Sequence, residues 1–196
     1  HSAIVLENDK EYLVEARLQN VARSAGLLSV TALITQLRAT TVNGMHHDVV
    51  EAMTTNESSF FRDVHPFEAL KKVVLPDLLQ KRATESLLRI WCAACSTGQE
   101  PYTLAMLLRE HFPLLNRWRV EILASDLSTK VLDRARQGIF SQLEVNRGLP
   151  AAFLVKYFQK QGVDWQIKDD IRKMVQFRQL NLIEPWPLLP PMEIVF

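Results

Sequence analysis

The loop Ser96-Thr97-Gly98 is the first stretch of this sequence that could bind a small ligand. It follows a short, mostly apolar run and precedes a helix that Pro101 is expected to open. A loop in this position points backbone N–H groups and a helix N-terminus at whatever binds above it, and Gly98 allows close approach of the backbone. The single glycine argues against a nicotinamide cofactor, whose fingerprint has three glycines. A plain tight turn would explain the loop equally well.

Asp126 is a second candidate contact, because it ends the next apolar run. An acidic side chain at the end of the second strand of such a unit can accept hydrogen bonds from both hydroxyls of a ribose. A helix N-cap or a solvated loop carboxylate would be the structural alternatives. Taken together, Asp126 and the Gly98 loop favour a ligand that contains a nucleoside.

Cys92 and Cys95 have the spacing of a redox or zinc pair. Zinc needs about four ligands, and the sequence offers neither a second Cys pair nor a nearby His. Strand alternation instead predicts Cys92 in the core and Cys95 in the loop, both with structural roles. The histidines show no metal-ligand spacing, so we expect no metal site.

The segment Asn56 to Asp63 places two adjacent aromatic residues, Phe60 and Phe61, between polar groups. Two core phenylalanines at the start of a helix would account for this pattern. The segment also lies just ahead of the region that carries the Gly98 loop and Asp126.

The hydrophobic pattern predicts helices in the first third of the chain. Helical periodicity covers residues 9–25, 30–39 and 46–53. A further helix is expected to open at Pro66 and to end or kink at Pro76. We therefore expect a helical domain over residues 1–76 and a linker over residues 77–83.

The pattern changes after residue 83. Short apolar runs predict strands over residues 87–93, 120–124, 174–182 and 192–196, with helices between the first three. This alternation is typical of a parallel, doubly wound α/β sheet. The fold class is therefore α/β, with a parallel-sheet domain over residues 84–196 after the helical one.

Composition limits the partners of this chain. Its 23 Lys and Arg residues face 22 Asp and Glu residues, and without a basic surplus we expect no nucleic-acid partner. A local basic face built from Arg17, Arg23 and Arg38 remains possible, because net charge hides patches. No apolar run reaches the roughly 18–20 residues that span a bilayer, so we expect no membrane insertion. Two cysteines favour a reducing cytoplasm.

Five segments together resemble the bacterial chemotaxis receptor methyltransferases, the CheR family. They occur in family order, and they are residues 56–63, 92–102, 124–128, 135–140 and 181–187. The resemblance implies a helical domain that docks a receptor, followed by a Rossmann-like class I methyltransferase domain over residues 84–196, which binds S-adenosylmethionine and releases S-adenosylhomocysteine. It implies a protein-glutamate O-methyltransferase that acts on the cytoplasmic helices of methyl-accepting chemoreceptors in chemotaxis adaptation.

The resemblance also implies roles for individual residues. The matching cofactor contacts are Asn56, Ser58 and Arg62 in the first segment, Gly98 and Glu100 at the glycine loop, Asp126 at the ribose, and Asn181 and Leu182 near the adenine. We expect Arg62 to act in catalysis by neutralising a carboxylate, that of the cofactor rather than that of the substrate. Ser58 stands where many members have Thr, and Gln99 where Glu is usual, but neither departure removes a role.

The resemblance also raises expectations about the end of the domain and about tethering. A Cys-Arg-Asn-Val-type segment follows the fourth strand in the family, so we expect a domain truncated after about that strand, with poor transfer and self-association through an exposed sheet edge. Some members grip a peptide at the receptor's C-terminus through a small β excursion. Residues 157–169 look short for that purpose, so we predict a member that needs no tether.

Two other functions stay open on the sequence. One is a regulatory or adaptor domain that binds S-adenosylmethionine without catalysis. The other is a methyltransferase with a different acceptor.

Overall fold

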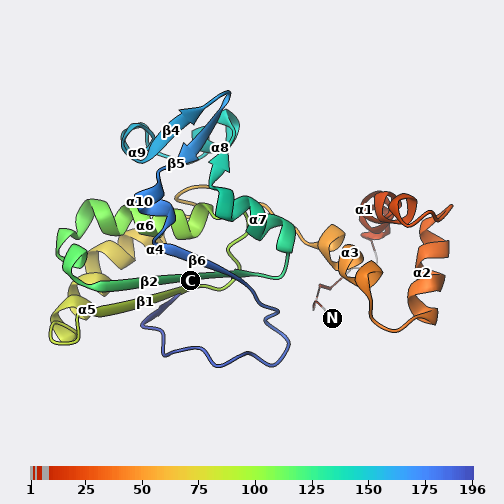
Figure 1. Ribbon diagram of the computed structural model, residues 1–196, viewed down its shortest axis with the longest axis horizontal. Coiled ribbons are helices and arrows are strands. Elements are labelled where there is room, and N and C mark those ends of the chain that lie inside the picture. Colours follow the sequence, from red (N-terminus) through yellow and green to blue (C-terminus); the bar gives the residue numbers. More distant parts are fainter. Residues whose placement is uncertain (1, 3, 6–8) are drawn as a thin grey trace. The chain divides into compact units, whose positions relative to one another are not determined.

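The computed structural model describes residue 2, residues 4–5 and residues 9–196 (Figure 1). It divides into two compact units, one of residues 1–55 with 183–185 and one of residues 56–182 with 186–196. The domain boundary predicted at residues 77–83 differs from this division, because residues 77–81 belong to a helix inside the second unit. Residues 56–76, predicted as part of the docking domain, also belong to the second unit.

The described part of the first unit forms the three predicted helices. They are α1 (Glu11–Ser24), α2 (Val30–Ala39) and α3 (Gly44–Met53). The Ser29 side chain caps α2 as expected, by accepting a hydrogen bond from the backbone N–H of Ala32. Arg17 donates to the carbonyl oxygen of Met53 over 2.7 Å. Arg17 therefore caps the C-terminal end of α3. Its guanidinium is engaged in this contact, so it is less available to a basic docking face.

The second unit begins with a helix whose hydrogen-bond register changes in the middle. Helix α4 (Val64–Ala69) runs into a π-helical turn, η1 (Leu70–Val74), and then into α5 (Leu75–Lys81). Pro76 lies in the first turn of α5, and its ring removes one N–H from the helix ladder. The kink predicted at Pro76 therefore takes the form of a wider turn just before it.

A four-stranded parallel sheet organises the second unit. Its strands are β1 (Leu87–Cys92), β2 (Arg119–Asp126), β6 (Val175–Gln179) and β7 (Ile194–Val195), in the order β6-β2-β1-β7. The four predicted strands and the α/β fold class are confirmed, although β6 and β7 are shorter than predicted. Because all pairs are parallel, the carboxyl ends of β1, β2 and β6 meet at one edge.

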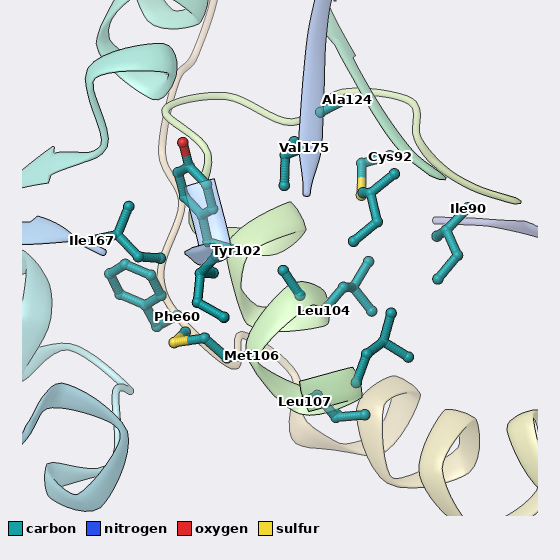
Figure 2. Packing of buried hydrophobic residues seen from close by; sticks show 14 of the residues in the cluster. Phe60, Ile90, Cys92, Tyr102, Leu104, Met106, Leu107, Ala124, Ile167 and Val175 are labelled. Atoms are coloured by element: carbon teal, nitrogen blue, oxygen red, sulfur yellow. The ribbon is translucent and has the colours of Figure 1, made fainter. Parts of the chain in front are cut away.

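The hydrophobic core lies between this sheet and its helices. Helix α6 (Gln99–His111) follows β1, the 3₁₀ turn η2 (Pro113–Arg117) leads into β2, and α7 (Thr129–Gln137) follows β2. Figure 2 shows the inner side chains of the sheet, such as Ile90 and Cys92, facing Leu104 and Leu107 of α6. On the other face of the sheet, Trp186 packs edge-on against Trp91 with ring centroids 5.0 Å apart.

A small antiparallel sheet stands beside the main one (Figure 1). Its strands are β3 (Ile139–Phe140), β4 (Phe158–Gln161) and β5 (Asp164–Ile167), in the order β3-β5-β4, with helices α8 (Gln142–Asn146), α9 (Ala151–Tyr157) and α10 (Asp169–Arg172) around it. Residues 157–169, which looked short for gripping a receptor peptide, thus contain a β-hairpin, and residues 139–140 add a third strand to it. Independence from a receptor tether stays a prediction.

Among the described residues, none of the helices has both the length and the apolar character of a membrane span. The same part of the chain contains no group of three or more His, Cys, Asp or Glu side chains that could hold a metal ion.

Candidate functional site

Asp126 fixes the geometry of the loop after β1. One oxygen of its carboxylate accepts a hydrogen bond from the backbone N–H of Ser96 over 2.8 Å, and the other accepts from that of Ser128 over 3.0 Å. The carboxylate therefore braces two loops at once, whereas the N-cap of α7 is Ser128. A carboxylate offers about four lone-pair sites, so acceptor capacity remains for ligand hydroxyls.

Gly98 has a packing reason for being glycine. Its φ of +96° is one that side chains rarely adopt, and an added Cβ would lie 3.0 Å from the Cβ of Ala135 in α7 and 3.2 Å from the Tyr102 ring. Close packing of the loop against α7 therefore already requires glycine at this position, whether or not a ligand lies above the loop. Its contact with a cofactor remains a proposal.

Glu100 lies in the first turn of α6, half-buried at the same end of the sheet. Burial raises the pKa of its carboxyl, while a hydrogen bond from the Cys92 thiol and the charge of Arg62 act in the opposite direction. A partly desolvated carboxylate in this position suits a cationic ligand group.

The two cysteines are buried and free. Burial raises the pKa of both thiols, which keeps them far from the reactive thiolate form. Their roles are therefore structural, as predicted.

The segment from Asn56 to Arg62 is bound to the start of α6. The Ser96 hydroxyl donates to the carbonyl oxygen of Asn56 over 2.9 Å, and the backbone N–H of Phe61 donates to the Thr103 hydroxyl over 3.2 Å. Arg62 donates to the carbonyl oxygen of Glu57 over 3.0 Å. These contacts hold Asn56 against the loop that carries Gly98 and hold Phe61, the residue before Arg62, against α6.

Phe60 is fully buried in the core, so the structural alternative for this segment is correct for that residue. Phe61 and Asp63 have left-handed backbone conformations, with φ of 49° and 51°. Such conformations are costly for non-glycine residues and persist where the surroundings enforce them. The segment is thus held in one defined path.

The remaining predicted residues lie at the same edge of the sheet. Leu180, directly after β6, donates its backbone N–H to the carbonyl oxygen of Asp126 over 3.0 Å. Asn181 and Leu182 therefore begin beside the end of β2. Ser58 lies half-buried in the middle of its segment. All eight predicted contact residues are thus carried by segments that converge on the carboxyl ends of β1, β2 and β6, which we call the candidate cofactor site.

Two residues that hold this arrangement were not foreseen. Ser96 links Asn56 to Asp126 through its hydroxyl and its backbone N–H. Thr103 accepts from Phe61 while donating to the carbonyl oxygen of Gln99 over 2.7 Å. A serine in a loop and a threonine in a helix are common, and no local pattern distinguishes these two from others of their kind.

Glu100→Gln is expected to raise the thermal unfolding midpoint at pH 7.5 by a few degrees. The raised pKa of Glu100 means that the folded state favours the neutral acid. Its contribution to stability is therefore present below the unfolded pKa of about 4.3 and is lost as pH rises through the folded value. Differential scanning calorimetry at pH 7.5 and pH 4 should show a gain that fades at the lower pH.

Glu110, at the other end of α6, is the matched control. Lys156 and Tyr157 bind its carboxylate and lower its pKa, so Glu110→Gln should have the opposite sign at pH 7.5. An unchanged or lower midpoint for Glu100→Gln at pH 7.5 would contradict the account of its burial.

Comparison with known proteins gives the same region a family. Residues 56–196 match the family model described as CheR methyltransferase, SAM binding domain, and the match starts where the second unit starts. The chain is 41% identical over 198 residues to Chemotaxis protein methyltransferase 1 of Pseudomonas aeruginosa, which covers 98% of this chain and 71% of that protein. Identity is 38% to Chemotaxis protein methyltransferase Cher2 of Pseudomonas putida, with the same coverage. It is 36% to Chemotaxis protein methyltransferase of Borreliella burgdorferi, over 98% of this chain and 70% of that protein.

Proposed function

Since the chain belongs to the CheR methyltransferase family, we propose that it is a protein-glutamate O-methyltransferase whose acceptors are glutamates on the cytoplasmic helices of chemoreceptors. S-adenosylmethionine as cofactor and methylation in chemotaxis follow from the family itself. The acceptor rests on the family match, and the position of the cofactor rests on one observation above all: Asp126, Glu100 and Arg62 lie on segments that meet at one end of the sheet.

The charges of these three residues fit the cofactor. S-adenosylmethionine carries a sulfonium, an ammonium and a carboxylate, and the site offers two carboxylates and one guanidinium. In the arrangement we propose, Asp126 accepts from the ribose hydroxyls, Glu100 faces the ammonium and Arg62 pairs with the carboxylate. The other proposed contacts are Asn56, Ser58, Gly98, Asn181 and Leu182.

The reaction suits a site that aligns its reactants and moves no proton. S-adenosylmethionine supplies a methyl group on positively charged sulfur. A glutamate side chain with an ordinary pKa of about 4.3 is ionised at neutral pH, so its oxygen can attack without a base. That oxygen bonds to the methyl carbon as the carbon–sulfur bond breaks, the electron pair stays on sulfur, and the products are a methyl ester and S-adenosylhomocysteine. The contribution of the chain is alignment and electrostatic complementarity.

Arg62→Lys is expected to weaken S-adenosylhomocysteine binding roughly tenfold. A lysine ammonium keeps the charge but cannot reproduce the two parallel hydrogen bonds of a guanidinium. Isothermal calorimetry measures the change. Arg172→Lys, at a half-buried arginine paired with Asp169, is the control and should bind as the wild type does. Native affinity in Arg62→Lys would remove Arg62 from the proposed cofactor contacts.

The acceptor is tested by the chemistry of the transferred group. The chain is incubated with tritiated S-adenosylmethionine and a receptor cytoplasmic fragment, and the product is treated with mild alkali. A methyl ester releases volatile methanol, and replacing the acceptor glutamates of the fragment with alanine should abolish the signal. Label that resists alkali would indicate another acceptor, and cofactor binding without transfer would indicate an adaptor.

We further propose a docking role for the helical unit and a cytoplasmic location, since the acceptors are cytoplasmic. Self-association through a sheet edge is part of the same proposal. Strand β7 is at an edge of the sheet, and Val195 in it is exposed. An edge strand presents unpaired backbone N–H and C=O groups, which can pair with a strand of another chain. Light scattering at increasing concentration tests this point, and a strictly monomeric chain would contradict it.

A further inference from the structure

Gly148, in the turn between α8 and α9, touches the backbone of the segment that carries Asn56, Ser58 and Arg62. A Cβ built on Gly148 would lie 2.1 Å from the carbonyl oxygen of Phe60, and the φ of Gly148 is +89°. Non-bonded carbon and oxygen atoms do not approach this closely. Any side chain at position 148 therefore forces one of the two backbones to move by roughly an ångström.

The segment cannot relieve such a contact by rotating Phe60. Its ring packs edge-on against Phe140 of β3 and Phe158 of β4, with centroids 5.0 and 5.7 Å apart. Figure 2 shows Phe60 within the buried cluster that also contains Met106 and Ile167. The next residue is fixed as well, because its backbone N–H donates to Thr103. A push on Phe60 is therefore passed along the backbone toward both ends of the segment.

Arg147 contacts the same segment at a second point. Its guanidinium donates to the Glu57 carboxylate over 2.5 Å, and this contact lowers the pKa of Glu57. Both side chains are exposed, so the pair adds little to stability. It does restrict the position of Glu57, whose carbonyl oxygen accepts the hydrogen bond from Arg62.

We propose that the Arg147–Gly148 turn positions the cofactor-contacting segment, Gly148 by admitting the Phe60 carbonyl and Arg147 by holding Glu57. Neither residue contacts the cofactor in this account, so both are positioning residues. The inference rests on the proposed cofactor site, because it assigns a function to the path of residues 56–62. It also gives the small sheet a role in positioning the segment, since β3 and β4 supply the rings that pack around Phe60.

The test compares two glycines. Gly162, at the tip of the β4–β5 hairpin, also has a positive φ, of +61°, but no atom lies within 4 Å of its added Cβ. Gly148→Ala and Gly162→Ala thus share the backbone strain and differ in the contact with Phe60. We expect S-adenosylhomocysteine affinity at least tenfold lower in Gly148→Ala than in Gly162→Ala, measured by calorimetry on folded full chains at 20 °C. Equal affinities would overturn the inference.

Binding of S-adenosylhomocysteine by the wild-type chain shows whether a negative result contradicts this inference or the proposed cofactor site itself. If the wild-type chain does not bind S-adenosylhomocysteine, the proposed cofactor site is wrong. If Gly148→Ala does not fold, Arg147 decides. Arg147→Gln should weaken binding about two- to fivefold, and Arg147→Lys, which keeps the ion pair, should restore it. Wild-type affinity in Arg147→Gln would then overturn the inference, because a purely structural turn would not respond to charge in this way.

Discussion

Phe60→Ala is expected to lower the free energy of unfolding of the second unit by about 3–5 kcal/mol, the range for a large buried aromatic side chain. Phe60 is 0% exposed, and its loss would leave a cavity between the rings of Phe140 and Phe158. Urea unfolding followed by tryptophan fluorescence measures the change. All four tryptophans lie in the second unit, so this signal reports on it alone.

Phe60→Leu is the matched variant, because it keeps most of the apolar volume. It should cost less than about 1.5 kcal/mol, as volume-conserving core substitutions do. The two variants should also differ in their affinity for S-adenosylhomocysteine. Phe60→Ala should bind more weakly than Phe60→Leu, because residues 56–62 lose the ring that packs them against Phe140 and Phe158. A cost below about 1 kcal/mol for Phe60→Ala would mean that this residue does not hold the segment in place.

Asp126→Ala is expected to weaken S-adenosylhomocysteine binding by about 1–3 kcal/mol, the scale of a lost charge-assisted hydrogen bond. Two effects add in the same direction. The ribose loses its acceptor, and the backbone N–H groups of Ser96 and Ser128 lose the carboxylate that fixes both loops. Calorimetric titration of the folded variant measures the combined loss.

Two further variants separate these effects. Asp126→Asn keeps one carbonyl oxygen as acceptor, so its affinity for S-adenosylhomocysteine should lie between those of Asp126→Ala and the wild type. Asp133→Ala removes an exposed aspartate of α7 that pairs only with Arg136 among its described contacts, and it should bind normally. Wild-type affinity in Asp126→Ala would remove this residue from the site.

Local pattern was sufficient to predict most of the fold. The buried strands β1 and β2 are continuous apolar runs between turn residues, and the first three helices follow a 3.6-residue period. The candidate contacts followed from the ends of those strands and from the family order of short segments. Parallel pairing then brought Asp126 and the Gly98 loop together, as expected for such sheets.

What the sequence could not predict depends on contacts between distant residues. The boundary between the units lies before Asn56 because Phe60 packs against Phe140 and Phe158, far along the chain. The small sheet has two-residue β3 and a β4 whose Gln159, Lys160 and Gln161 are all exposed, so alternation is weak there. Gly148 lies in an ordinary turn, and its φ of +89° and its contact with the Phe60 carbonyl explain why it is glycine, neither of which can be read from the sequence.

The central claim is that residues 56–62, the loop after β1, and the ends of β2 and β6 form one cofactor site. Hydrogen–deuterium exchange with and without S-adenosylhomocysteine tests it most directly, because it reports on every segment at once. The account predicts slower exchange in residues 56–62, 94–100, 125–128 and 180–182, with no change in helices α1, α2 and α3. Protection confined to the first unit, or to the opposite sheet face around Arg89 and Met192, would contradict it.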